Sequence, residues 1–346
     1  MSIYSIITIG DKMKIKLYFE NEKAIAKSGI GRALRHQQSA LKLNGIEYTH
    51  DHREKEYDIL HINTVWLSSY FEVKKAKRMN KKIVFHAHST MEDFKNSFMF
   101  SNLLAPLYKK WLIHMYNYGD LIITPTPYSK SILESYGIKK PIYAISNGID
   151  VKQFEYDQQK VEKFKKYFHL SNDQKVIISV GWLFERKGFD TFCEVASNLP
   201  EYTFIWFGDI NLSAPTKKIR KLIANPPKNV ILPGYISGDV IKGAYLGADL
   251  FFFPSREETE GIVVLEALAS KIPVLVRDIP VYQGWLVDHE NCYKASSNRE
   301  FIYLINDMIH SDLTHLTTQG YQLAKTKSLM NIGKSLKKAY EMVLKD

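Results

Sequence analysis

Short apolar runs alternate along the chain with longer segments of helical character. The short runs predict β-strands, because a buried strand needs only about four to eight apolar residues. Strands that alternate with helices are typical of parallel βα units, so the pattern predicts an α/β fold. Ten strands are predicted, at residues 14–19, 59–62, 82–86, 121–124, 142–145, 175–180, 203–207, 230–232, 250–253 and 274–276.

The ten strands fall into two series of five, separated by a polar and strongly charged stretch at residues 151–172. Each series suits one doubly wound sheet domain, and a chain of 346 residues suits two domains. We therefore predict Rossmann-like domains at residues 1–165 and 166–325. A helix predicted at residues 332–343 lies in the terminal segment 326–346, which is expected to pack back against the first domain.

The composition, 45% hydrophobic and 24% charged, is that of a globular protein. No stretch approaches the roughly 20 apolar residues that a membrane-spanning helix needs. The N-terminal segment lacks the features of a signal peptide, and both Met1 and Met13 are candidate translation starts. The two cysteines, Cys193 and Cys292, indicate neither a disulfide framework nor a metal cluster, which fits a reducing cytosol.

The net charge of +10 is uneven, with about +8 in residues 1–150 and about +2 in the remainder. A basic half of this kind predicts an acidic partner. Composition by itself does not separate nucleic acid from an anionic membrane surface. The basic cluster at residues 74–82 belongs to no recognisable nucleic-acid-binding module.

Two glycine-containing loops follow predicted strands and precede predicted helices. In KSGIGR, Gly29 and Gly31 let the backbone approach an anionic ligand at a helix N-terminus; an ordinary turn is the alternative. In GWLFERKGF, Gly181 is followed by Arg186 and Lys187. Two cations at the carboxyl end of a parallel strand suit a diphosphate, and a solvated basic loop is the alternative.

Four carboxylates surround a third strand-to-helix turn, in the sequence SREETEGIVVLEAL. Glu257, Glu258 and Glu260 precede a helix that is predicted to begin near Gly261, and Glu266 lies one to two turns inside that helix. A carboxylate within an apolar stripe needs hydrogen-bond donors, which sugar or ribose hydroxyls supply. The side chains of Glu257 and Glu260 are expected to be solvated.

Together these motifs resemble a known family. Glu258 and Glu266, eight positions apart with Gly261 between them, are similar to the E-x7-E signature of retaining family-4 glycosyltransferases with the GT-B fold. The glycine loop, the histidine of HAHST, DLIITPTPYSKSIL, SNGIDVKQF and the RKG loop also occur in the family's order. The resemblance covers nearly the whole chain. It implies an α/β GT-B architecture, in which two doubly wound domains face a central cleft and the C-terminal helix crosses back to the first domain.

The resemblance implies roles for individual side chains. Arg186 and Lys187 would neutralise the diphosphate of a nucleotide-sugar donor. Glu266 would hold the nucleotide ribose, and Glu258 would bind hydroxyls of the transferred sugar. His88 would lie beside the reacting sugar. These residues form the predicted catalytic and donor site.

Backbone groups complete the predicted donor site. One departure from the family pattern is Trp182, which follows Gly181 where many members have arginine, so Arg186 would carry more of the diphosphate charge. His86 is the alternative to His88 as the sugar-site histidine. The predicted backbone contacts are those of Gly29, Gly31, Gly181, Glu260, Gly261 and Ile262.

Departure of the nucleotide diphosphate would develop negative charge that preorganised cations and N–H groups stabilise. No Asp-x-Asp motif stands in the donor region, so we expect no metal site and no required cofactor, with non-specific stimulation by Mg²⁺ allowed. The resemblance implies front-face attack by the acceptor hydroxyl, without a covalent intermediate on Glu258.

Residues 94–118 combine large apolar side chains with lysines in the basic half. Such a segment can lie in a membrane interface with its lysines toward anionic headgroups; a core helix with a solvated rim is the alternative. The predicted acceptor and membrane residues are Lys95, Phe98, Lys109, Lys110 and Trp111.

The segments FENEKAIAKSGIGRALRHQ, HAHSTMEDFKNSF and GWLFERKG are similar to Gram-positive glycosyltransferases that add the second hexose of a diglycosyl-diacylglycerol. This resemblance implies transfer of α-glucose or α-galactose from the UDP-sugar to monoglucosyl-diacylglycerol, for glycolipid and lipoteichoic acid anchor synthesis. The enzyme would be cytoplasmic and peripherally bound to the anionic inner face of the cell membrane, with no nucleic-acid partner. The alternatives are a family-4 enzyme that extends a capsule or other surface polysaccharide, and a GT-B epimerase or nucleotide-sugar-binding protein.

Overall fold

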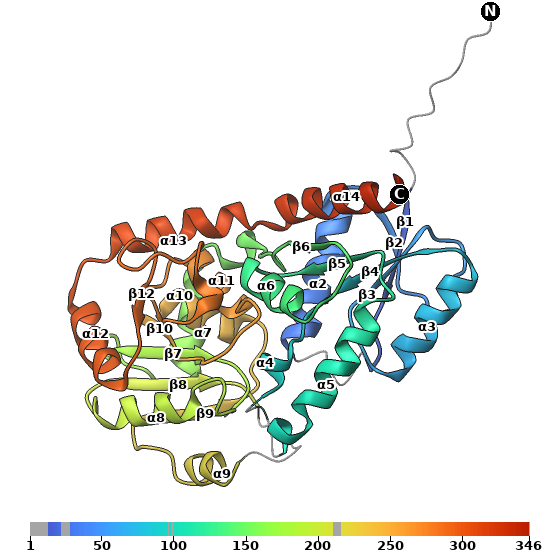
Figure 1. Cartoon of the computed structure of the whole chain (residues 1–346). Helices are drawn as coiled ribbons and strands as arrows, with labels where there is room; N and C mark the ends of the chain where they lie inside the picture. The colour runs from blue at the N-terminus through green and yellow to red at the C-terminus, as the bar shows by residue number, and fades with distance from the viewer. Residues whose placement is uncertain (1–12, 22–27, 96, 98–99, 210–215, 346) are drawn as a thin grey trace, which may run out of the picture. The chain divides into compact units, whose positions relative to one another are not determined.

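The computed structural model describes residues 13–21, 28–95, 97, 100–209 and 216–345. Within these ranges the chain forms two compact units, each built on one sheet of six parallel strands (Figure 1). Unit 1 comprises the described parts of Met1–Thr90, Lys109–Gly148 and Leu329–Asp346, and unit 2 comprises those of Met91–Tyr108 and Ile149–Ser328.

The sheet of unit 1 has the strand order β2-β1-β3-β4-β5-β6. The chain moves from β1 to β2 on one side and then continues with β3 on the other, which creates the switch point of a doubly wound fold. β3 and β5 are buried at every position, as expected where helices cover both faces of a parallel sheet. The strands are β1 (Lys14–Tyr18), β2 (Glu47–Thr49), β3 (Ile59–Ile62), β4 (Lys82–His86), β5 (Leu121–Thr124) and β6 (Ile142–Ala144).

The C-terminal helix is part of unit 1. It packs on α2 so closely that a Cβ on Gly333 would lie 2.4 Å from the carbonyl oxygen of Ala40, and the Tyr340 hydroxyl lies 2.7 Å from Nδ1 of His61. The helices of unit 1 are α2 (Gly29–Leu43), α3 (Leu67–Arg78), α6 (Pro127–Ser135), α14 (Leu329–Lys345) and the second half of α5 (Ser101–Tyr116).

The sheet of unit 2 has the strand order β12-β11-β10-β7-β8-β9. Its strands are β7 (Val176–Val180), β8 (Thr203–Phe207), β9 (Val230–Gly234), β10 (Leu250–Phe253), β11 (Val274–Arg277) and β12 (Tyr293–Ala295). Its helices are α4 (Met91–Phe94), the first half of α5, η1 (Val151–Phe154), α7 (Gln158–Tyr167), α8 (Phe189–Ser197), α9 (Lys217–Ala224), α10 (Asp239–Gly247), α11 (Ile262–Ala269), η2 (Pro280–Tyr282), α12 (Asn298–His310) and α13 (Thr314–Thr326).

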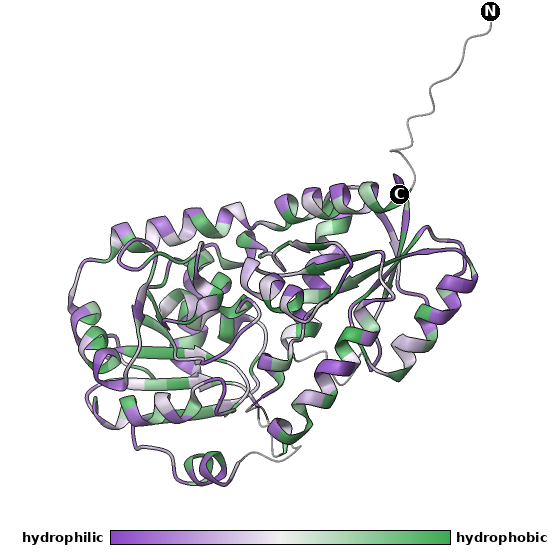
Figure 2. Ribbon diagram, viewed as in Figure 1, coloured by the Kyte–Doolittle hydropathy of each residue, from purple (hydrophilic) through white to green (hydrophobic). Residues whose placement is uncertain are grey.

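Apolar residues concentrate along the strands, whereas the helices alternate between apolar and polar residues (Figure 2). Under the sheet of unit 2, the Phe192 ring meets Trp206 edge-on with ring centroids 5.0 Å apart and stacks on Phe252 at 5.8 Å. All three side chains are fully buried. This aromatic core joins α8 to β8 and β10.

All ten predicted strands are confirmed, with ends within two residues of the prediction. Two further strands in the described ranges, β2 and β12, were not predicted. Each has three residues and lies at the edge of its sheet. Each includes a charged residue, in the sequences EYT and YKA, so neither carries a continuous apolar run.

The boundaries of the two units differ from the domain boundary that the charged stretch predicted. Residues 149–165 belong to unit 2, not to the first domain. The reason is that α7 packs on α10, where a Cβ on Gly243 would lie 2.0 Å from the carbonyl oxygen of Lys160. Residues 91–108 also belong to unit 2.

Among the helices that the structure describes, none is long and apolar enough to cross a membrane.

Candidate functional site

The loops that follow β7 and β10 lie at neighbouring carboxyl ends of the unit 2 sheet, because β7 and β10 pair in parallel. The chain continues from β7 to β8 on one side and resumes with β10 and β11 on the other. Open α/β sheets bind ligands at such a switch point. The first loop carries Arg186 and Lys187 and the second carries Glu258, so the fold brings the two sequence motifs together.

Lys187 and Glu258 form an ion pair in which Glu258 is buried and Lys187 is partly buried. The Lys187 ammonium lies 2.5 Å from Oε1 of Glu258, and the Ser255 hydroxyl donates to the same oxygen at 2.6 Å. Burial by itself would raise the pKa of Glu258, but Lys187, Arg186 and the Ser255 hydroxyl lower this pKa below its ordinary value. Burial lowers the pKa of Lys187, and Glu258 opposes that effect. Glu258 is therefore an ionised carboxylate that accepts hydrogen bonds.

The Arg186 guanidinium contacts both the second loop and the segment around α4. Nη1 donates to the carbonyl oxygen of Glu257 at 2.8 Å and lies 2.8 Å from Oδ1 of Asp93. Nε donates to the Ser97 hydroxyl at 3.0 Å. With Lys187 next in the chain, the first loop presents two adjacent cations, which suit a diphosphate.

The two loops touch through their backbones. Gly188 has a φ of +77°, and a Cβ at this position would lie 2.2 Å from the carbonyl oxygen of Pro254. The backbone N–H of Arg256 donates to the carbonyl oxygen of Arg186 at 2.8 Å. Glycine is therefore required at position 188 for two reasons, the left-handed backbone conformation and the close approach to Pro254.

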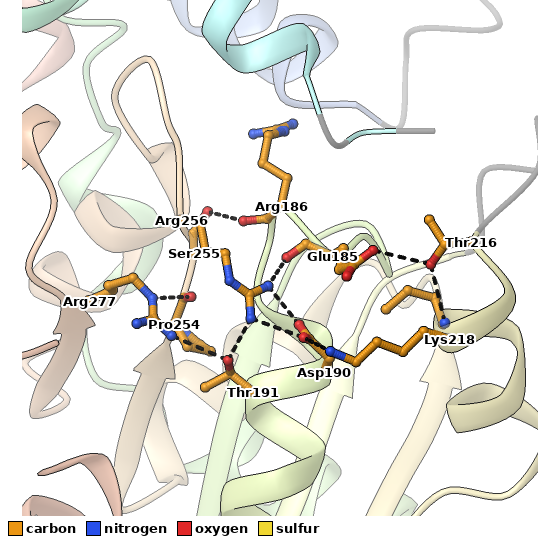
Figure 3. A network of polar contacts seen from close by, with 11 residues as sticks. Glu185, Arg186, Asp190, Thr191, Thr216, Lys218, Pro254, Ser255, Arg256 and Arg277 are labelled. Atoms are coloured by element: carbon orange, nitrogen blue, oxygen red, sulfur yellow. Dashed lines mark hydrogen bonds and ion pairs between the residues drawn. The ribbon is translucent and has the colours of Figure 1, made fainter. Parts of the chain in front are cut away.

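A network centred on Arg256 and Asp190 fastens the same two loops together (Figure 3). Nη1 and Nη2 of Arg256 lie 2.7 and 3.0 Å from Oδ1 and Oδ2 of Asp190, and Nη1 also donates to the carbonyl oxygen of Glu185. Arg277 donates to the carbonyl oxygen of Pro254 at 3.1 Å and to Thr191 Oγ1 at 3.2 Å. The sequence interpretation missed this network, whose only local signal was an arginine and an aspartate next to the two motifs.

The turn before α11 is more deeply buried than expected. Gly261 is the N-cap of α11 with a φ of +89°, and the helix begins at Ile262, as predicted. The side chain of Glu260 is 1% exposed, so the expectation that it is solvated was wrong. Glu260 directly precedes the N-cap of α11, and a negative charge near a helix N-terminus is favoured by the helix dipole. Glu257 is partly exposed.

Glu266 lies inside α11 and is buried, with Oε2 accepting a hydrogen bond from the Tyr245 hydroxyl at 2.8 Å. Gly181 directly follows β7, and its carbonyl oxygen accepts a hydrogen bond from the Trp206 indole at 2.8 Å. Trp182 stacks on Phe184, with ring centroids 6.2 Å apart. These residues belong to unit 2, with the two loops and Glu258.

The remaining predicted site residues belong to unit 1. Ser28 is the N-cap of α2, and its hydroxyl accepts a hydrogen bond from the Gly31 N–H at 3.3 Å. Gly29 is the first residue of that helix. The loop therefore forms a helix N-terminus, as predicted, at the carboxyl side of β1.

Three histidines form a buried polar cluster in unit 1. The rings of His86 and His88 stack with centroids 4.1 Å apart, and those of His61 and His86 at 5.5 Å. Nε2 of His88 lies 3.0 Å from Oδ1 of Asn63, and the Gln37 amide lies 2.9 Å from Nε2 of His61. His88 and His86 are both buried, so exposure does not separate the two candidates for the sugar-site histidine.

This cluster predicts a loss of stability on mild acidification. Burial lowers the pKa of His61 and His88 to about 3, and burial also lowers the pKa of His86. As the pH falls below about 6.5, the unfolded chain binds protons that the folded cluster does not. The free energy of unfolding should therefore fall by up to about 1.4 kcal/mol per pH unit for each imidazole. Urea midpoints measured between pH 7 and pH 5 should show this fall.

A variant separates the imidazoles from other titrating groups. His86→Phe keeps a ring in the stack and removes one titrating group. The free energy of unfolding of this variant should therefore change less steeply with pH. Most carboxylates stay ionised above pH 5, which limits their contribution in this window. Urea midpoints that are constant across the window would contradict the argument.

The predicted acceptor residues differ in exposure. Lys110 is exposed on α5, whereas Lys95 and Lys109 are partly exposed, with Lys109 over the Tyr136 ring. The Trp111 indole donates to the carbonyl oxygen of Val65 at 2.5 Å and is partly buried. Phe98 lies outside the described residues. No group of three or more His, Cys, Asp or Glu side chains that could hold a metal ion occurs in the described part of the chain.

Known proteins resemble the chain over nearly its whole length. Residues 35–153 match the family described as Glycosyltransferase Family 4, and residues 160–322 match Glycosyl transferases group 1. A processive diacylglycerol alpha-glucosyltransferase from Acholeplasma laidlawii is 49% identical over 96% of this chain and 99% of the relative. An alpha-galactosylglucosyldiacylglycerol synthase from Streptococcus pneumoniae is 26% identical over 85% of this chain and 80% of the relative.

Solved structures share the fold at low sequence identity. A sucrose-phosphate synthase from Thermosynechococcus elongatus has a TM-score of 0.81 at 15% identity, over 96% of this chain and 99% of the other. Anabaena Alr3699/HepE in complex with UDP and glucose has a TM-score of 0.77 at 16% identity, over 95% and 100%. These similarities confirm the predicted GT-B fold.

Proposed function

Because this chain belongs to the family-4 glycosyltransferases with the GT-B fold, we propose that it transfers an α-hexose from a UDP-sugar to a diacylglycerol glycolipid. The observation that supports the proposed acceptor is the 49% identity to a relative named as a diacylglycerol glucosyltransferase, over 99% of that relative. Retention of the anomeric configuration follows from the family. The relatives do not favour the alternatives, a polysaccharide-extending enzyme or an epimerase.

The donor site is proposed at the switch point of unit 2. Arg186 and Lys187 would bind the diphosphate, and Glu266 would bind the ribose. A bound diphosphate would compete with Glu258 for Lys187, and the ionised Glu258 carboxylate would then accept hydrogen bonds from the transferred sugar. The solved complexes of a fold neighbour with UDP and with UDP-glucose support a UDP-sugar donor. Backbone groups at Gly181 and around Gly261 would complete the site.

Glucose is the proposed hexose. The relative with 49% identity is named a glucosyltransferase, whereas the relative named for galactose is 26% identical. The proposed acceptor is monoglucosyl-diacylglycerol, with diacylglycerol itself as the competing acceptor. Use of the diglycosyl product as a lipoteichoic acid anchor stays a prediction.

The chemistry needs the developing charge on the UDP leaving group to be stabilised, and preorganised cations do this without reorganisation. Arg186 and Lys187 would supply that charge. No cofactor is proposed, so a chelator should leave the rate nearly unchanged. In unit 1, His88 would bind the reacting sugar, and its bond to Asn63 would fix the orientation of the ring.

Peripheral binding to an anionic membrane, at the inner face of the cell membrane, is proposed from exposed apolar residues beside lysines. On α3, Leu67 and Phe71 are 68% and 67% exposed, and the last turn of the helix is basic. On α5, Leu103 and Leu107 are 78% and 68% exposed, one turn apart and followed by Lys110. Apolar side chains flanked by cations suit a membrane interface. Trp111, bonded to Val65, would support α5 rather than insert.

The test is a transfer assay on anionic phosphatidylglycerol vesicles that contain diacylglycerol or monoglucosyl-diacylglycerol. UDP-glucose should yield a diglucosyl lipid with an α-linkage, and UDP-galactose should react at least about tenfold more slowly, since a few contacts to one hydroxyl decide the choice. Thin-layer chromatography identifies the product, and proton NMR coupling identifies the anomer.

Three results would contradict parts of this proposal. Release of UDP without a lipid product would remove the acceptor assignment. A β-linked product would exclude retention of the anomeric configuration. Equal activity on neutral phosphatidylcholine vesicles and on anionic vesicles would remove the electrostatic part of membrane binding.

A further inference from the structure

The carboxylate of Glu266 is held by a tyrosine from another helix. The side chain of Glu266 is 5% exposed, and its Oε2 accepts a hydrogen bond from the Tyr245 hydroxyl at 2.8 Å. A buried carboxylate is strongly unfavourable unless hydrogen-bond donors surround it. Hydrogen bonds to an ionised acceptor are among the stronger ones in proteins, so this bond has a large influence on the orientation of Glu266.

The Tyr245 ring is itself fixed by packing. Tyr245 lies on α10 and is 2% exposed. Its ring meets Phe154 edge-on, with centroids 5.6 Å apart, and stacks on Phe251 at 5.7 Å. Because these contacts come from η1 and from β10, the hydroxyl has a defined position relative to the sheet. The position of one carboxylate oxygen of Glu266 is therefore fixed as well.

Packing alone does not explain the hydroxyl. A phenylalanine would make the same two aromatic contacts, and burying a hydroxyl without a partner is unfavourable. The oxygen that distinguishes tyrosine from phenylalanine is the atom that bonds Glu266. The pair thus combines a buried acid with a donor whose position is set by three elements of unit 2.

We propose that Tyr245 is a positioning residue for the donor nucleotide. It holds the Glu266 carboxylate in the orientation in which that carboxylate accepts hydrogen bonds from the ribose hydroxyls. Tyr245 acts through Glu266 and does not touch the nucleotide. The inference rests on the proposed function, in which Glu266 binds the ribose.

The test uses Tyr245→Phe, which removes one oxygen and keeps the ring. Calorimetric titration of the full-length protein with UDP should show about tenfold weaker binding, the size expected for a lost hydrogen bond to a charged group. Binding of 2′-deoxy-UDP should weaken by about threefold or less, because this ligand lacks one of the hydroxyls that Glu266 binds. The preference for UDP over 2′-deoxy-UDP should therefore fall.

Tyr202→Phe is the matched control. Tyr202 is also a buried tyrosine of unit 2, and its hydroxyl donates to Oδ1 of Asn306 at 3.0 Å, so its loss should leave both affinities unchanged. Glu266→Gln provides the second test. In a Glu266→Gln background, Tyr245→Phe should cause no further loss of UDP affinity, because the two residues act as one unit.

Unchanged UDP affinity in Tyr245→Phe would overturn the inference. Equal losses for UDP and 2′-deoxy-UDP would also overturn it, since they indicate a general structural effect. Additive losses in the double variant would do the same. Failure of the wild-type protein to bind UDP would instead overturn the proposed function, and the inference with it.

Discussion

Replacing Lys187 with alanine is expected to lower kcat by about two to three orders of magnitude, as when one preorganised donor to a developing anion is removed. The Lys187 ammonium is partly buried at the switch point and lies 2.5 Å from Oε1 of Glu258. In the proposed reaction the negative charge on the diphosphate grows toward the transition state. The loss should therefore be larger in kcat than in UDP affinity. Steady-state kinetics and calorimetric titration with UDP measure the two effects separately.

The alanine variant also leaves a buried carboxylate without its cation, which can lower the free energy of unfolding by about 3 kcal/mol. The double variant Lys187→Ala/Glu258→Gln removes that unpaired charge. It should recover much of the lost melting temperature but none of the lost kcat. Lys175→Ala is the matched control, because Lys175 is ion-paired with Asp249 at 2.8 Å at the opposite end of the sheet. A Lys187→Ala enzyme with normal kcat would exclude the diphosphate assignment.

Gly188→Ala is expected to destabilise unit 2 by about 3 kcal/mol and to lower kcat as well. The added Cβ would lie 2.2 Å from the carbonyl oxygen of Pro254, a backbone atom that can move only with its loop. The loops that carry Lys187 and Glu258 would be forced apart. Thermal unfolding and steady-state kinetics with the UDP-sugar measure both consequences.

Gly234→Ala separates the clash from the backbone strain. Gly234 has a φ of +78°, and nothing lies within 4 Å of a Cβ added there. This variant should show the cost of the left-handed conformation alone, about 1 kcal/mol, with kcat unchanged. Equal destabilisation of the two variants would show that the contact with Pro254 has no energetic weight.

The strands were predictable because most of them are buried on both faces. A parallel strand covered by helices on each side needs an unbroken apolar run, such as Leu250–Phe253, and such a run is visible without knowledge of its neighbours. The edge strands β2 and β12 have only three residues each, one of them charged, and so lack this signal. The unit boundary depends on the packing of α7 on α10, a contact between residues far apart in the chain.

The motifs of the candidate site were also predictable, because glycines and paired charges mark a strand-to-helix turn. Arg186, Lys187, Glu258 and Glu266 are recognisable from residue type and spacing. The burial of Glu260 was not predictable, since a charged residue before a helix is usually solvated.

The sequence by itself determined the fold class, the two sheets and the family, because local apolar runs and short motifs suffice for each of them. The tertiary structure decided which side chains hold those motifs in place. Asp190 and Arg256 are 66 positions apart, and Tyr245 and Glu266 are 21 apart. Such pairs leave no periodic trace in the sequence, because their contact exists only after the strands between them have assembled into one sheet.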